Sequence, residues 1–156
     1  MLEIERKFLV SDPQILARAS KKNYLKQGYL NRNPARTVRV RIQDNQGLLT
    51  VKGKSNESGT TRIEWETQID VPDAEDLLAL CEPGIIEKYR HLIAVDGHLF
   101  EVDQFLGANE GLLLAEIELP TEDATFPKPA WLGKEVTGDK RYYNSYLSET
   151  PYSEWP

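Results

Sequence analysis

The sequence predicts an α+β fold in which eight antiparallel strands close into a barrel, or tunnel, with a few peripheral helices. Three observations predict it. Eight stretches alternate between apolar and polar residues, tight-turn residues separate several of them, and helical signals are confined to three short segments. The 156 residues contain no internal repeat and no long linker, so residues 1–156 are expected to form a single domain.

Alternation of apolar and polar side chains predicts the strands, because successive residues of a strand point to opposite faces of its sheet. Turn residues at 44–47, 96–97 and 107–111 separate neighbouring stretches, and the Asp-Gly pair at 96–97 suits a tight hairpin. Strands joined by such turns run antiparallel. The expected strands span about 2–10, 24–31, 36–43, 48–53, 60–70, 84–95, 98–106 and 111–119.

Helical signals are few and lie between or after the strands. One segment, Pro13 to Ser20, follows a capping Asp12. A second runs from Pro72 to Cys81, and a third from about Asp139 to Leu147. We therefore expect a mostly β domain with short helices at its margins.

The composition indicates a compartment and excludes some partners. With 25 acidic and 19 basic residues, the formal charge is −6, which disfavours a nucleic-acid-binding exterior. The single Cys81 cannot form an internal disulfide, so a reducing cytoplasm is expected. The opening residues lack an apolar signal core, and no stretch is long enough to suggest a membrane span. We expect neither secretion nor membrane binding.

The charged residues of the predicted strands share one face of each strand, and several form same-sign pairs two residues apart. For any single strand, a solvated outer face is the simpler explanation. Repeated like-charge pairs are better explained if an ion of opposite charge lies between them, a divalent cation for carboxylates and phosphate for basic groups. The charged faces would then line the barrel interior. The pairs are Glu3/Glu5, Arg39/Arg41, Glu64/Glu66, Lys88/Arg90 and Glu116/Glu118.

An ordered set of motifs, each on its own predicted strand, gives a family resemblance. The first is the E-x-E-x-K signature of Glu3 to Lys7. Together with further motifs along the chain, this signature makes the chain resemble the CYTH superfamily, also called triphosphate tunnel metalloenzymes. Within that superfamily it resembles the small bacterial inorganic tripolyphosphatases. The further motifs are Gln27–Leu30, Arg39-x-Arg41, Lys52 in T-V-K-G, Gly59–Glu66, Lys88-x-Arg90, Glu101-x-Asp103, Glu116-x-Glu118 and Glu135–Asn144.

The resemblance implies a closed eight-stranded tunnel that acts on a triphosphate with a divalent metal. Hydrolysis of tripolyphosphate to pyrophosphate and phosphate needs the substrate charge neutralised and a water activated. The basic residues expected to bind phosphate are Lys7, Arg39, Arg41, Lys52, Arg62, Lys88, Arg90 and Lys134. The carboxylates expected to hold Mg²⁺ or Mn²⁺ are Glu3, Glu5, Glu64, Glu66, Asp103, Glu116 and Glu118.

Three residues are expected to take part in catalysis. Glu116 would orient the attacking water. Resemblance to the tripolyphosphatases also implies a dyad in which the Lys7 ammonium lowers the pKa of the Tyr29 phenol. Alternatively, Tyr29 only donates a hydrogen bond to phosphate. His91 and His98 share the apolar faces of their strands, so we expect no zinc site.

Other functions remain open at this stage. The same framework serves class IV adenylate cyclases and thiamine or nucleoside triphosphatases, and clamp residues alone could form a non-catalytic polyphosphate-binding module. The expected partner is a small triphosphate, and the chain is expected to be a monomer or a homodimer. We expect Phe8, Trp65, Tyr89 and Ile117 to lie in the core, whereas residues 151–156 could be a disordered tail or a packed strap.

Overall fold

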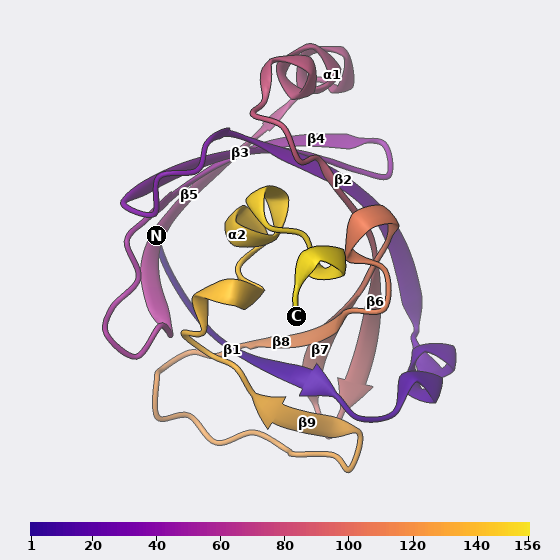
Figure 1. Cartoon of the computed structure of the whole chain (residues 1–156). Coiled ribbons are helices and arrows are strands. Elements are labelled where there is room, and N and C mark those ends of the chain that lie inside the picture. The colour runs from indigo at the N-terminus through magenta and orange to yellow at the C-terminus, as the bar shows by residue number, and fades with distance from the viewer.

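The computed structural model describes all 156 residues and contains nine strands (Figure 1). All eight predicted strands form, and turns lie within the predicted positions 44–47, 96–97 and 107–111. The strands are β1 (Leu2–Val10), β2 (Lys21–Asn31), β3 (Arg36–Gln43), β4 (Gln46–Gly53), β5 (Thr61–Ile69), β6 (Ile86–Val95), β7 (His98–Phe105), β8 (Leu113–Glu118) and β9 (Leu132–Glu135).

Eight of the strands form a closed antiparallel ring, so the predicted barrel is confirmed (Figure 1). The order around the ring is β5-β4-β3-β2-β6-β7-β8-β1, and β1 returns to β5 to close it. Strand β1 achieves this by changing partners along its length: Leu2, Glu3 and Ile4 pair with β5, whereas residues 5–9 pair with β8. Because the ring is closed, none of its eight strands is an unpaired edge strand, and its inner face is enclosed.

Strand β9 is an addition that the sequence did not predict. It has four residues and pairs antiparallel with the end of β1, opposite Phe8 and Val10. Alternation over four residues is too short to distinguish a strand from a loop. The pairing places the chain beside the barrel mouth immediately before the C-terminal segments.

The helices are short and peripheral. Helix α1 (Val71–Leu80) packs Ala74 and Leu78 against the outside of β2, β3 and β4. The segment predicted as a helix over 13–20 is a 3-10 helix, η1 (Pro13–Arg18), capped by Asp12. The segment predicted over 139–147 divides into η3 (Lys140–Tyr142) and α2 (Asn144–Glu149). The brief 3-10 helices η2 (Gly107–Asn109) and η4 (Tyr152–Glu154) complete the list.

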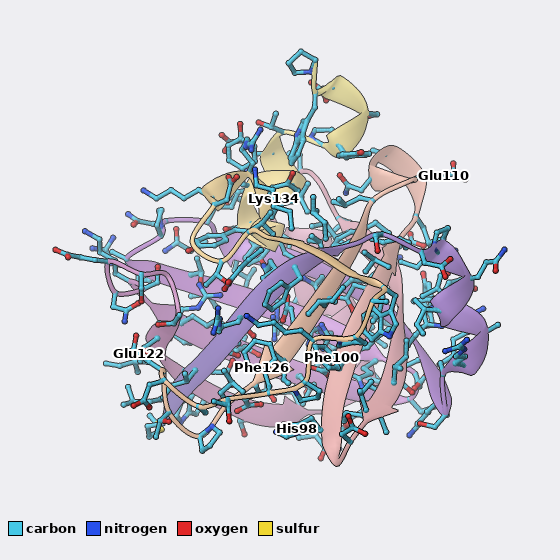
Figure 2. The ribbon with its side chains drawn as sticks, turned by 90° about the horizontal axis from the view of Figure 1, so that it is seen from below. His98, Phe100, Glu110, Glu122, Phe126 and Lys134 are labelled. Carbon is cyan, nitrogen blue, oxygen red and sulfur yellow. The ribbon has the colours of Figure 1, made fainter.

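Part of the hydrophobic core lies outside the barrel, between the outer faces of the strands and the loop that follows β8. Phe8, Phe100 and Ile117 point outward from the barrel and are buried. The ring of Trp131 packs edge-on against that of Phe100, with 5.2 Å between the ring centroids. Phe126, from the loop after β8, packs against the same cluster (Figure 2). The expectation that Phe8 and Ile117 lie in the core is confirmed.

The outer face of strand β5 is exposed to solvent, because no helix or loop covers it. The side chain of Trp65 is 45% exposed, so the prediction that it lies in the core is wrong. Tyr89 on β6 is only half-buried. Alternation identifies the apolar face of a strand, but it does not show whether another segment covers that face.

One end of the barrel interior is filled with apolar side chains. Ile86, Phe105 and Leu114 share strand parity with charged interior residues and pack against Leu147 of α2. The C-terminal segments, including α2, lie across this opening in the view along the barrel (Figure 1). Residues 151–156 form a packed strap, because the Trp155 ring packs against Tyr142 and Tyr152, each at 5.2 Å between centroids.

Two glycines allow the β4–β5 loop to meet the segment after β9. Gly59 and Gly138 both have φ of +78°, and a Cβ on Gly59 would lie 2.3 Å from the Cα of Gly138. Gly59→Ala should therefore lower Tm by about 5 °C or more, from backbone strain plus the clash. Calorimetry would measure the change.

Gly97 provides the matched control for this prediction. It has the same φ of +78°, but an added Cβ would meet nothing within 4 Å. Gly97→Ala should lower Tm by roughly half as much or less, since only the backbone cost applies. Equal losses in the two variants would show that the close approach of Gly59 to Gly138 does not matter.

None of the helices combines the length and the apolar character that crossing a membrane requires.

Candidate active site

The charged interior of the barrel encloses a cavity of about 170 Å³. Seven acidic and seven basic side chains line it, so its formal charge is zero. Such a cavity suits a small, highly charged ligand together with a counter-ion rather than an apolar molecule. The acidic residues are Glu3, Glu5, Glu64, Glu66, Glu101, Glu116 and Glu118, and the basic ones are Lys7, Arg39, Arg41, Lys52, Arg62, Lys88 and Arg90.

The sequence predicts sixteen site residues, and fourteen of them line the cavity. Lys134 is exposed on β9 and does not line the cavity, which corrects its expected role in binding phosphate (Figure 2). Asp103 is also absent from the lining, because it lies buried behind Lys88 and Arg90. Its expected role as a metal ligand stays a prediction, although it does not line the cavity.

The cavity also contains residues that sequence reasoning missed. Thr37 lies two residues before Arg39 on β3, so strand parity alone could have identified it. Tyr143, Asn144 and Ser145 reach the cavity from the C-terminal segment. No local pattern in the sequence indicates that this segment folds back across the barrel.

Several carboxylates are already paired with basic groups. The Lys52 ammonium lies 2.9 Å from Glu3 and 3.2 Å from Glu64. Glu66 lies 3.5 Å from Arg39 and also accepts a hydrogen bond from Thr50. These carboxylates balance neighbouring cations on β3, β4 and β5. They have less negative charge to offer a metal ion than an unpaired carboxylate would.

Two carboxylates have no basic group within 4 Å, and they face each other across β1 and β8. These are Glu5 and Glu118, which are cross-strand partners. Burial raises the pKa of Glu5 to about 8, and the nearby charges of Glu116 and Glu3 add to the effect. Carboxylates therefore gather at this part of the wall without a basic partner within 4 Å, and the raised pKa keeps a proton on Glu5 near neutral pH, which a divalent cation would displace. The carboxylates as they lie form no ready-made group of three metal ligands.

Positive charge accumulates without compensation on the opposite side, at β3. Arg41 has no carboxylate within 4 Å, and its Nε donates only to the side-chain oxygen of Gln27, at 2.9 Å. Burial lowers the pKa of Arg41 to about 9, and its neighbours Arg39 and Arg90 repel its charge. The Nε of Arg39 is buried with no hydrogen-bond acceptor. Unpaired buried donors of this kind indicate a site for an anion.

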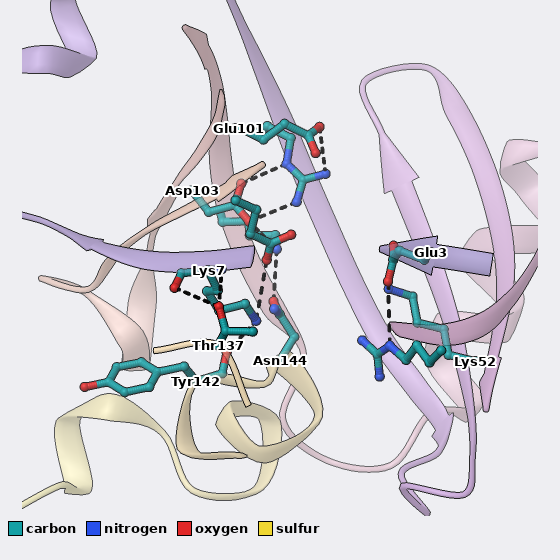
Figure 3. A network of polar contacts seen from close by, with 12 residues as sticks. Glu3, Lys7, Lys52, Glu101, Asp103, Thr137, Tyr142 and Asn144 are labelled. Carbon is teal, nitrogen blue, oxygen red and sulfur yellow. Dashed lines mark hydrogen bonds and ion pairs between the residues drawn. The ribbon is translucent and has the colours of Figure 1, made fainter. Parts of the chain in front are cut away.

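Asp103 holds two of the basic residues from behind the cavity wall (Figure 3). Its carboxylate lies 2.7 Å from the Lys88 ammonium and accepts two hydrogen bonds from Arg90, at 2.8 and 2.9 Å. Burial alone would raise its pKa, but Arg90 and Lys88 hold the pKa of Asp103 at about 2. It is therefore a fully ionised partner of cations.

Lys7 points toward the C-terminal segment. Its ammonium donates to the backbone carbonyl of Tyr142 at 3.1 Å and lies 3.5 Å from Glu116 (Figure 3). The ring of Tyr143 lies 5.4 Å away, a cation–π distance. Tyr29 lines the same cavity, but no hydrogen bond joins it to Lys7. The expected Lys7–Tyr29 dyad is not formed in this structure.

Neither histidine belongs to the cavity. His91 contacts the side chain of Gln104 at 3.1 Å. His98 lies in the β6–β7 hairpin, at the bottom of Figure 2. The site chemistry therefore depends on carboxylate, ammonium, guanidinium and phenol groups.

Comparison with known proteins assigns this arrangement to a family. The model of the CYTH domain matches residues 1–147, which include every lining residue of the cavity. The chain belongs to the CYTH domain family. It is similar to an inorganic triphosphatase of Acetivibrio thermocellus, with 48% identity over 154 residues that cover 98% of this chain and 97% of the relative.

Further relatives agree with this CYTH assignment. An inorganic triphosphatase of Nitrosomonas europaea is 41% identical over 156 residues, covering 95% of this chain and 97% of the relative. The crystal structure of the inorganic triphosphatase NE1496 superposes with a TM-score of 0.66 at 38% identity. That superposition covers 94% of this chain and 93% of the other. The CYTH tunnel is thus shared in both sequence and architecture.

Proposed function

We propose that this CYTH domain is an inorganic triphosphatase that hydrolyses tripolyphosphate to pyrophosphate and phosphate. Two relatives that match nearly the whole chain carry that name, at 48% and 41% identity. The single observation in the site that supports it best is the separation of uncompensated charge. The carboxyl groups of Glu5 and Glu118 have no basic partner within 4 Å, and the guanidinium of Arg41 has no acidic one. A triphosphate and a divalent cation would neutralise both.

The donor set of the acidic wall fits a hard divalent cation, Mg²⁺ or Mn²⁺. Glu5, Glu116 and Glu118 supply only carboxylate oxygens, which these cations prefer. Glu5 and Glu118 have no basic group within 4 Å, whereas Glu116 lies 3.5 Å from the Lys7 ammonium, so a cation would supply the partner that the first two lack. When bound, the cation would neutralise phosphate charge and make a bound water more acidic.

The basic side chains bind and orient the substrate. Arg39 and Arg41 present unpaired guanidinium donors that match phosphate oxygens, and Lys88 and Arg90 line the same cavity from β6, on the other side of β2. Water attacks the terminal phosphorus and the bridging P–O bond breaks. The water oxygen stays on the released phosphate, and pyrophosphate leaves. Glu116 would orient that water and accept its proton.

The direct test is phosphate release from tripolyphosphate, ATP and thiamine triphosphate, measured side by side in Mg²⁺ and in Mn²⁺ with cyclic AMP monitored in parallel. We expect release from tripolyphosphate to be fastest and to cease when a chelator removes the metal. Formation of cyclic AMP would favour a cyclase instead. No release from any substrate, together with tight binding of tripolyphosphate, would indicate a binding module.

Divalent cations should also stabilise the protein when no substrate is present. Millimolar Mn²⁺ should raise Tm by roughly 5 °C, since a ligand at about 100 times its Kd contributes about 2.7 kcal/mol. Differential scanning calorimetry would measure the shift. NaCl of equal ionic strength is the control, and an equal shift with NaCl would contradict a metal site in the cavity.

A further inference from the structure

Asp103 is the most deeply buried carboxylate of the barrel, at 1% exposure, and it does not reach the cavity. We propose that Asp103 is a positioning residue, which fixes the direction in which Lys88 and Arg90 present their protons to the substrate. The proposal rests on the proposed triphosphatase function and deepens it. It assigns to Asp103 a role different from that of a metal ligand.

The oxygens of Asp103 are fully engaged with cations. One, Oδ1, accepts from the Nε of Arg90 at 2.8 Å. The other, Oδ2, accepts from Arg90 Nη2 at 2.9 Å and lies 2.7 Å from the Lys88 ammonium. This is a two-point contact with a guanidinium plus an ion pair, which orients both cations at once. A metal ion at Asp103 would have to displace these donors.

The hydrogen bonds of the Lys88 ammonium leave one N–H donor free for the substrate. The ammonium has three donors. One points to Asp103, at 2.7 Å, and one donates to the side-chain oxygen of Asn144, at 2.9 Å (Figure 3). Because Lys88 is 1% exposed and lines the cavity, the third donor is the one available to a phosphate oxygen.

The same count applies to Arg90. The Nε–H and one N–H of Nη2 both donate to the carboxylate of Asp103. Nη1 lies 3.4 Å from Glu101, at the edge of hydrogen-bond distance. The remaining guanidinium edge therefore faces the cavity, which Arg90 lines. A single buried carboxylate thus leaves each cation with a defined face for the anion.

The contact extends to the C-terminal segment. The side-chain oxygen of Asn144 accepts from Lys88 and also from the amide of Gln27, at 3.3 Å. Gln27 in turn accepts from Arg41. Arg41, Lys88 and Arg90 are therefore held in one continuous hydrogen-bonded arrangement, in which Asp103 is the one carboxylate that contacts both Lys88 and Arg90. Removing its charge should misdirect the cations without removing them.

The test is the variant Asp103→Asn, which keeps the shape of the side chain but not its charge. Steady-state kinetics with tripolyphosphate should show KM raised about 10-fold or more, with a smaller change in kcat. Mn²⁺ binding, measured by calorimetry without substrate, should keep its Kd within about 2-fold. The comparison variant Glu118→Gln should show the reverse pattern, with Mn²⁺ binding weakened.

Two results would overturn the proposal. The first is a loss of Mn²⁺ affinity in Asp103→Asn as large as that in Glu118→Gln, because it would make Asp103 a metal ligand. The second is an unchanged KM for tripolyphosphate. If the single variant fails to fold, the double variant Asp103→Asn/Lys88→Gln removes both charges of the pair. Its KM should then exceed that of Lys88→Gln alone, because Arg90 also loses its fixed direction, and an equal KM would contradict the positioning of Arg90 by Asp103.

A failure of the proposed function can be told apart from a failure of this inference. If the wild-type chain does not hydrolyse tripolyphosphate, calorimetric titration with tripolyphosphate replaces KM. Weaker anion binding in Asp103→Asn with unchanged Mn²⁺ binding would then support positioning without catalysis. Equal anion binding in the two proteins would overturn the inference.

Discussion

A Glu5→Gln variant should lose at least about 100-fold of its tripolyphosphatase activity while becoming more stable than the parent chain in metal-free buffer at pH 9. Even residues that only support a metal ligand typically cost 10- to 100-fold when they are removed, so a direct ligand should cost about 100-fold or more. Phosphate release at saturating Mg²⁺ and calorimetry without metal measure the two effects.

The gain in stability follows from the surroundings of Glu5. It is buried near Glu116 and Glu3, and no basic group lies within 4 Å of it. A neutral amide of the same shape removes that repulsion, which should raise Tm by roughly 3 °C or more in metal-free buffer at pH 9, above the Glu5 pKa of about 8; the gain should vanish near pH 7, where Glu5 already carries a proton. Mn²⁺ should then stabilise the variant less than it stabilises the parent chain.

The exposed Glu75 of α1 offers a matched control. Glu75→Gln makes the same chemical change outside the cavity, so activity and Tm should stay near those of the parent. If Glu5→Gln hydrolyses tripolyphosphate at the parent rate, Glu5 does not hold the metal. If it loses activity and stability together, the loss reflects misfolding, and the assigned electrostatic role of Glu5 is wrong.

An Arg41→Met variant should lose about 100-fold in kcat/KM for tripolyphosphate, mainly through KM. Removing one member of a buried charge pair typically costs 2–5 kcal/mol, and a tenfold change corresponds to about 1.4 kcal/mol. Methionine keeps much of the side-chain volume of arginine but removes its donors. Initial rates over a range of tripolyphosphate concentrations give the two constants.

The protein without substrate should tolerate this change. Arg41 has no carboxylate partner, and Arg39 and Arg90 repel it, so its removal should leave Tm unchanged or slightly higher. Arg36 lies on the same strand but is exposed, and Arg36→Met is the matched control. An Arg41→Met enzyme with the parent KM would exclude Arg41 from the phosphate site.

Strand parity in the sequence predicted most of the cavity. Same-sign pairs such as Glu3/Glu5 and Arg39/Arg41 lie on the inner face of the barrel, as alternation requires. Parity gives the face of a side chain but not its depth or its partner. Asp103 is the example: it lies on the correct face, yet Lys88 and Arg90 cover it from the cavity. Only the three-dimensional pairing of β6 with β7 reveals this.

The remaining errors have a different physical origin. Lys134 lies on β9, a strand too short to have a readable period, so its exposed position could not be inferred. Tyr143 and Asn144 reach the cavity because the chain folds back across the barrel after β9. Such contacts join residues more than 50 positions apart, as between Asn144 and Lys88, and local patterns carry no information about them.

The most direct test of the account is the position of Mn²⁺ in a crystal grown with Mn²⁺ and tripolyphosphate, measured by anomalous scattering. We predict a peak coordinated by oxygens of Glu5, Glu116 and Glu118, with the phosphate chain extending from it toward Arg41. A peak beside Asp103, or tripolyphosphate bound away from Arg41, would contradict the charge separation on which the proposed function rests.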